Sequence, residues 1–331
     1  MIESIRQNPW SKSGKTLFSE GTTNPQVAIQ QAGLDWNADK VRLRCADTLD
    51  AVGDYCAIRR SDNSKVLGVV GSDYEPFQNS AMFQVFNDLA HARCNVVTPF
   101  KIETAGSFQG GKIVWALCDL PALGIIIGDD HIKTYLLVSN GHNGKKTLTI
   151  APTTIRVICQ NTLAMAEAQA RGERRKGKLS GGFAVKHTPG LIGAVEEVKE
   201  IYNQTIRNRF ATDDAFKHLA KVQLTQKLER EFMASVFGVS GPSESERAKT
   251  IRKHRDERIA AILASPTSQV KGTKDSGFSL LNAITEYIDH DRTTRTSEEG
   301  STDEARLMSS VMGSGLALKE RAWDSMLELV G

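Results

Sequence analysis

Residues 125–170 read IIIGDDHIKTYLLVSNGHNGKKTLTIAPTTIRVICQNTLAMAEAQA and are the most informative part of the chain. The β-branched and apolar runs at 134–138 and 147–150 are typical of strands. Between them lie two Asn-Gly dipeptides, at 140–141 and 143–144. Such dipeptides favour tight hairpin turns, because both residue types adopt positive φ at low cost. The stretch therefore predicts antiparallel strands joined by a tight polar turn.

A helix is expected directly after these strands. Asn161 and Thr162 are residue types that cap helix N-termini, and good helix formers follow at 163–167. Five basic residues come next, namely Arg171, Arg174, Arg175, Lys176 and Lys178. A twisted sheet with lysines at a hairpin tip and a basic segment behind its helix is an outline suited to a polyanion.

The rest of the first 170 residues also mixes helices with short strands. Helical signals occur at 24–32, with Pro25 at the first helical position, and at 80–92, where apolar residues recur with a 3.6-residue period. Strand patterns occur at 41–45, 55–59, 66–71, 96–104 and 112–118. We therefore expect residues 1–170 to form an α+β domain, with a mostly antiparallel twisted sheet and packed helices.

The character of the sequence changes after residue 170. Residues 171–190 are basic and rich in glycine, which predicts a linker. Helical periodicity then dominates residues 191–331. Helices are expected at 191–237, 247–263, 278–290 and 306–330, the last interrupted near Gly313. We expect nearly all sheet residues to lie before position 160.

Length and composition are those of an ordinary globular protein. The 331 residues carry a net charge of +3, which permits nucleic-acid binding without arguing for it. The five cysteines lie far apart, mostly in apolar runs, so we expect reduced core residues. The N-terminus lacks the apolar core of a signal peptide, and no segment reaches the ~20 apolar residues of a membrane span. We expect a cytoplasmic protein with no membrane contact and no cofactor.

Lys145 and Lys146 in the hairpin and Arg156 on the next strand are the first candidates for contacts to phosphate. Lys and Arg raise affinity for nucleic acids by neutralising phosphates and releasing counterions. Arg156 lies in an apolar strand, where a buried charge is costly unless it is paired. It therefore either faces a ligand or makes a structural salt bridge to a carboxylate such as Asp129 or Glu103.

His142 and the basic segment 171–178 complete the candidate nucleic-acid surface. His142 lies between the two Asn-Gly dipeptides and looks exposed, so it either contacts the ligand or is simply solvated. Aromatic residues make up 6% of the chain, which argues against a platform that stacks many bases. A groove that follows the phosphate backbone remains compatible with this composition.

A second interpretation is a metal site. Asp129, Asp130 and His131 stand at a strand entrance, and Glu286 and His290 are four residues apart on one helix face. Carboxylates and imidazoles are ligands for metal ions. The simpler interpretation is a turn in the first case and a helix end in the second. The chain has no glycine-rich phosphate loop, no HExxH and no CxxC pattern.

Three blocks of the sequence resemble a family of phage- and plasmid-related proteins with a domain of unknown function. The blocks are AGLDW at 32–36, TYLLVSNGHNG through RVICQNTL at 134–163 and NAITEYIDH at 282–290. The chain departs from the family pattern at Asn143, where the family usually has Asp. The resemblance implies a mobile-element context, and the outline of strands followed by a helix is similar to phage single-strand annealing proteins.

Three functions are therefore considered. The first is binding of DNA, expected to be single-stranded, along its phosphate backbone in annealing or recombination, with a homo-oligomer as a further expectation. The second is a metal-dependent enzyme that acts on nucleic acid. The third is a non-catalytic protein that counters a host factor.

Overall fold

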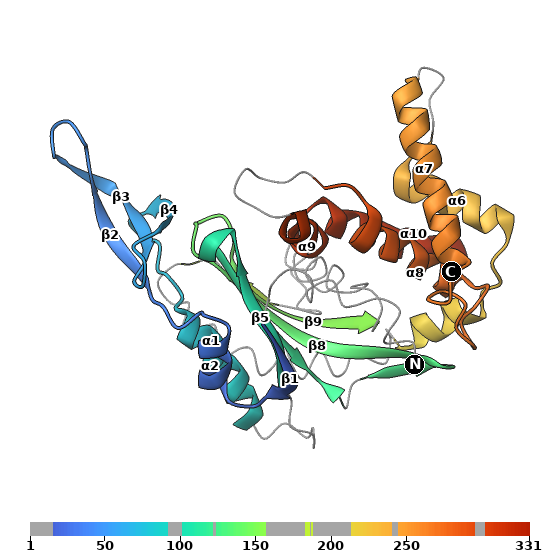
Figure 1. The fold of residues 1–331 in the computed structure, drawn as a ribbon, viewed down its shortest axis with the longest axis horizontal. Coiled ribbons are helices and arrows are strands. Elements are labelled where there is room, and N and C mark those ends of the chain that lie inside the picture. The colour runs from blue at the N-terminus through green and yellow to red at the C-terminus, as the bar shows by residue number, and fades with distance from the viewer. Residues whose placement is uncertain are drawn as a thin grey trace.

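The structure is a computed structural model with two β-sheets and a helical C-terminal part (Figure 1). It describes residues 16–91, 101–121, 124–156, 183–185, 187, 213–239, 244–294 and 302–331.

A large antiparallel sheet forms the centre of the fold. Its strands run in the order β1-β5-β6-β8-β9-β10, and β7 pairs with β8. The strands are β1 (Thr16–Thr22), β5 (Lys101–Phe108), β6 (Ile113–Asp119), β7 (Ile125–Ile127), β8 (Asp130–Gly141), β9 (Leu148–Arg156) and β10 (Phe183–Val185). Because β10 pairs with β9, the range expected to be a linker contributes a strand to this sheet.

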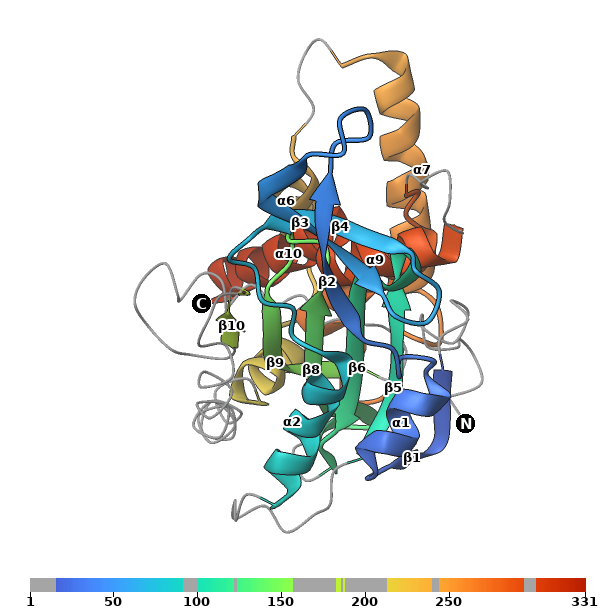
Figure 2. The same ribbon diagram turned by 90° about the vertical axis from the view of Figure 1, so that its left-hand side faces the viewer.

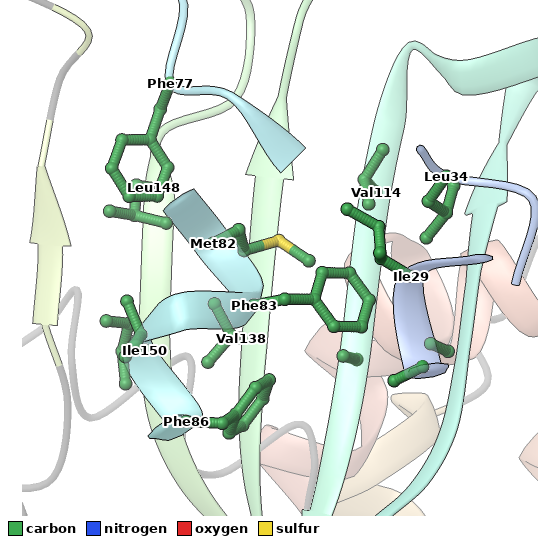
Figure 3. Packing of buried hydrophobic residues seen from close by; sticks show 14 of the residues in the cluster. Ile29, Leu34, Phe77, Met82, Phe83, Phe86, Val114, Val138, Leu148 and Ile150 are labelled. Carbon is green, nitrogen blue, oxygen red and sulfur yellow. The ribbon is translucent and has the colours of Figure 1, made fainter. Parts of the chain in front are cut away.

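Both faces of the large sheet are covered. One face packs against α1 (Pro25–Gln31) and α2 (Asn79–His91). Figure 3 shows Met82, Phe83 and Phe86 of α2 against the strands that carry Val114, Val138 and Ile150. Alternate residues of β6 point to the other face, where Trp115 and Leu117 pack with Met308 of α9 (Thr302–Met312). Strand β6 is therefore apolar from Ile113 to Cys118, as buried central strands are.

A second, three-stranded sheet projects from this body, and we call it the β-arm (residues 38–71). It is an antiparallel meander of β2 (Ala38–Arg44), β3 (Ala51–Arg60) and β4 (Val66–Gly71), as the sequence predicts. Cys56, Ile58 and Val70 on its inward face join the core formed with α1 and α2. Figures 1 and 2 show the β2–β3 hairpin pointing away from the large sheet.

The described part of the C-terminal half is helical. Its elements are a helix at 213–221, α6 (Gln226–Phe237), α7 (Glu246–Leu263), α8 (Gly277–Glu286), the π-helix η5 (Tyr287–Asp291), α9 and α10 (Ser314–Val330). Apart from α9, these helices share a core of their own, to which Ile125, Ile127 and Ile132 of the large sheet contribute. The helices are therefore packed against the end of the sheet that carries β7.

The α+β class expected from the sequence is confirmed. Beyond residue 191, the extended pairing among the described residues is an isolated bridge between Gln223 and Ser276. The expected last helix is interrupted at Gly313, between α9 and α10. Cys56 and Cys118 are buried free thiols, whereas Cys45 is exposed, which corrects the expectation for that residue. The helix expected after Asn161 lies outside the described residues.

The prediction that both Asn-Gly dipeptides form turns is wrong for the first of them. Strand β8 continues through Asn140 and Gly141, because Gly141 still pairs with Ile113 of β6. The Asn140 side chain is buried, and its amide donates to the carbonyl oxygen of Phe77 at 2.8 Å. The turn follows at 142–147, where Gly144 has a φ of 72°.

Candidate functional site

A pocket of about 970 Å³ lies where the β-arm, the large sheet and the C-terminal helices meet. Its walls come from β4, from the β5–β6 and β8–β9 turns, from the residues after η5, and from α9 and the start of α10. The lining residues are Leu67, Gly68, Val69, Gln109, Lys112, Ile113, Asn143, Lys145, Lys146, Arg292, Thr293, Thr294, Ala305, Met308, Ser309, Gly313 and Ser314. This volume is typical of ligand-binding sites.

Among the described residues, the lining includes four cationic side chains and no Asp or Glu, so we call this cavity the basic pocket. The cations are Lys112, Lys145, Lys146 and Arg292. Within the described residues, Lys112, Lys145 and Arg292 form no ion pair with a carboxylate. Positive charges gathered in a cavity raise the local concentration of anions. The basic pocket is therefore an anion-attracting site.

Serine hydroxyls hold Arg292 at the pocket wall. Its Nη1 donates to Ser309 Oγ at 3.4 Å and to Ser314 Oγ at 3.1 Å. Ser309 Oγ also accepts from the backbone N–H of Gly315 at 3.2 Å. Helix α10 begins after Gly313, which has no side chain that could cap it. The guanidinium group and the partly positive N-terminus of α10 thus lie at the same wall.

A buried ionic cluster fixes the elements of this wall. Lys319 Nζ of α10 lies 2.8 Å from Asp289 Oδ1 of η5 and donates to Ser310 Oγ of α9 at 2.9 Å. Ser310 Oγ in turn donates to Asp289 Oδ1. Both charged side chains are completely buried, and buried charges persist only when they are paired. The cluster ties α9 and α10 to the π-helix that immediately precedes Arg292.

The β8–β9 turn places the two predicted lysines at the opposite wall. Asn143 Oδ1 accepts from the backbone N–H of Lys145 at 3.0 Å, which stabilises the turn. Strand β4 fits closely against it, because a Cβ atom at Gly68 would lie 2.8 Å from the Cα of Asn143. Lys145 is exposed and Lys146 is half-buried. The structure thus brings Lys145 and Lys146 together with Lys112 and Arg292.

His142 is buried, so the expectation of an exposed contact residue is wrong. Its side chain is 0% exposed, and its Nε2 lies 2.8 Å from Asn79 Oδ1. The Trp36 ring meets it edge-on at 5.3 Å. Burial and, second, the proximity of His187 lower the pKa of His142 to about 3. The extra length of β8 explains the difference, because it carries residue 142 into the interface between the two sheets.

Arg156 lies on a strand of the large sheet, and the basic segment lies outside the described residues. Arg156 is the last residue of β9 and pairs with Ile132. Glu103, one proposed partner, accepts hydrogen bonds from Tyr135 at 2.7 Å and from Lys133 at 3.4 Å. The phosphate role of Arg156 stays a prediction. Arg171, Arg174, Arg175, Lys176 and Lys178 lie outside the described residues.

The residues of the alternative metal site do not form one. Asp129 and His131 are exposed, Asp130 and Glu286 are buried, and His290 is half-buried. Asp130 and His131 are adjacent on a strand and point to opposite sides. Across the described ranges, no three His, Cys, Asp or Glu side chains are placed to hold a metal ion.

Sequence reasoning missed Lys112, Arg292, Ser309 and Ser314. Lys112 follows a Gly-Gly pair that does not match a phosphate-loop motif, and Arg292 follows a helix end. The hairpin lysines could be predicted from the local sequence, because a tight turn exposes its side chains. The other residues meet them only through the packing of the C-terminal helices on the sheet.

Comparison with protein families matches residues 66–312 to a domain of unknown function, DUF932. Comparison with curated proteins and with solved structures found no match. Within the described residues, no helix is both long enough and apolar enough to cross a membrane. The matched region contains every residue that lines the basic pocket except Gly313 and Ser314. It also covers about three quarters of the chain, and the chain therefore belongs to the DUF932 family.

Proposed function

We propose that this protein binds single-stranded DNA along its phosphate backbone at the basic pocket, in strand annealing or recombination of a phage or plasmid. The observation that carries the binding function is the cluster of Lys112, Lys145, Lys146 and Arg292 in a cavity to which the described part of the chain contributes no carboxylate lining residue. The phage or plasmid setting rests on the resemblance of the three sequence blocks.

The chemistry of the lining supports a phosphate ligand in particular. Guanidinium and ammonium groups make charge-assisted hydrogen bonds to phosphate oxygens. Thr293, Ser309 and Ser314 add hydroxyl groups that can donate to the same oxygens. None of these contacts depends on the identity of a base, so binding is expected to be independent of sequence.

The first prediction concerns the hairpin lysines. The double variant Lys145→Ala/Lys146→Ala should bind a single-stranded oligonucleotide more weakly at low salt than the wild type. Each lost phosphate contact should reduce the steepness of log K against log salt concentration by about 0.7, because fewer counterions are released. Fluorescence anisotropy at four or more salt concentrations measures both quantities.

Two lysines of α7 supply a matched control. Lys249 and Lys253 are exposed and form ion pairs with Glu246 and Glu257 on their own helix. The variant Lys249→Ala/Lys253→Ala removes the same net charge at a distance from the pocket, and its salt dependence should equal that of the wild type. If both double variants change the slope equally, net charge rather than the pocket governs binding.

A further inference from the structure

The β-arm exposes an unusual share of the large apolar side chains. Of the ten such side chains that are exposed in the described part of the chain, five lie between positions 49 and 69. They are Leu49, Val52, Tyr55, Val66 and Val69. Exposed apolar residues gathered in one place commonly mark a binding surface.

The strand register places three of these side chains on one face of the β-arm. Ala57 pairs with Val69 and Arg59 pairs with Val66. Tyr55 lies two residues before Ala57 on β3, so its ring projects to the same side. Tyr55, Val66 and Val69 are 55%, 51% and 58% exposed. We call this set the outer strip, because Cys56, Ile58 and Val70 of the opposite face point into the core.

The outer strip is continuous with the basic pocket. Val69 belongs to both, since it lines the pocket and pairs with Ala57, two residues from Tyr55 on the same face of the sheet. The space next to the Tyr55 ring is open, because its cross-strand partner is Gly71, where an added Cβ atom would meet nothing within 4 Å. An apolar surface that carries one aromatic ring therefore begins at the rim of a cavity that is lined by cationic side chains.

We infer that the outer strip takes the bases of a single-stranded nucleic acid whose phosphates lie in the basic pocket. This inference rests on the proposed function, and it adds a reason why the protein would bind a single strand in preference to a duplex. An unpaired strand presents phosphates together with the flat apolar faces of its bases, whereas a duplex hides those faces in its stack. Stacking on Tyr55 is independent of sequence, because every base has a π-face.

Charge complementarity favours this occupant over a second copy of the chain. The pocket that Val69 lines also carries Lys112, Lys145 and Arg292, which have no carboxylate partner among the described residues. A ligand that covers the strip and continues into the pocket must therefore combine apolar surfaces with regularly repeated negative charges. A nucleic-acid strand does so along its whole length.

The test compares Tyr55→Ala with Tyr55→Phe. Tyr55→Ala should weaken binding of a single-stranded oligonucleotide by about tenfold, because stacking of one base on one ring contributes about 1–3 kcal/mol. Tyr55→Phe keeps the ring and should bind like the wild type. Neither variant should change the salt slope or the affinity for a duplex of equal length. Because Tyr55 is more than half exposed, both variants should keep the wild-type melting temperature.

The possible results separate this inference from the proposed function. If the wild type shows salt-sensitive binding and Tyr55→Ala binds single strands equally well, the inference is overturned while the proposed function stands. If the wild type binds no DNA at low salt, the proposed function fails and the inference with it. If Tyr55→Ala changes only the sedimentation of the protein, the strip is an interface between copies and the inference is wrong.

Discussion

At the scale of single residues, Asn79 determines the tautomer of His142. The amide nitrogen of Asn79 donates to the carbonyl oxygens of Leu34 and Trp36, so its Oδ1 must accept from the imidazole. Nε2 of His142 therefore carries the hydrogen. Nδ1 of the ring has no hydrogen-bond partner within the described residues, so a second proton would lack an acceptor. The buried ring is stable only in its neutral form.

This arrangement makes stability depend on pH. In the unfolded chain His142 has the ordinary histidine pKa of about 6.5, whereas burial lowers the pKa in the folded state to about 3. Between these values the unfolded chain binds the extra proton, so acid favours unfolding. The contribution of His142 is fully present above pH 6.5 and falls by about 1.4 kcal/mol per pH unit as the pH drops from 6.5 toward 3.

The measurement is thermal melting of the wild type and of His142→Gln between pH 7.5 and 5. On acidification, the melting temperature of the wild type should fall further than that of the variant, since Gln does not titrate. His187, whose pKa burial also lowers, provides a second variant, His187→Gln, with a change in the same direction. Equal losses in the wild type and both variants would show that folding does not lower the pKa of either histidine.

At the scale of elements, the β7–β8 turn connects the sheet to the helical half. Gly128 in this turn has a φ of 60°, and a Cβ atom there would overlap the carbonyl oxygen of Lys271. The next residue, Asp129, donates its backbone N–H to the same oxygen at 2.9 Å. Only a residue without a side chain allows this approach of the two backbones.

Gly128→Ala should therefore destabilise the protein through two effects, an unfavourable φ and a backbone clash. Gly33→Ala is the matched control, because Gly33 has a φ of 63° but nothing within 4 Å of its Cβ position. The control should cost about 1–2 kcal/mol of unfolding free energy from the left-handed conformation alone. Gly128→Ala should cost clearly more in urea unfolding. Equal costs would mean that the turn does not pack against residues 271 and 272.

At the scale of the whole molecule, sequence patterns predicted the elements better than the site. Pro25 begins α1, as expected, and the turn at Gly144 follows directly from its dipeptide. These features depend on neighbours in the sequence. The burial of His142 and the approach of Arg292 to Lys145 depend on contacts between distant elements, for which a single sequence has no local signal.

The most direct test of the proposed function is the salt dependence of single-stranded DNA binding in Arg292→Gln. This residue lies on the pocket wall opposite the hairpin lysines and shares no local sequence with them. Arg258→Gln is the control, because Arg258 lies outside the pocket lining and pairs with Asp291, next to Arg292, at 3.1 Å. We expect Arg292→Gln to reduce the salt slope by about 0.7 and Arg258→Gln to leave it unchanged. An unchanged slope in Arg292→Gln would contradict the basic pocket as the binding site for the phosphate backbone.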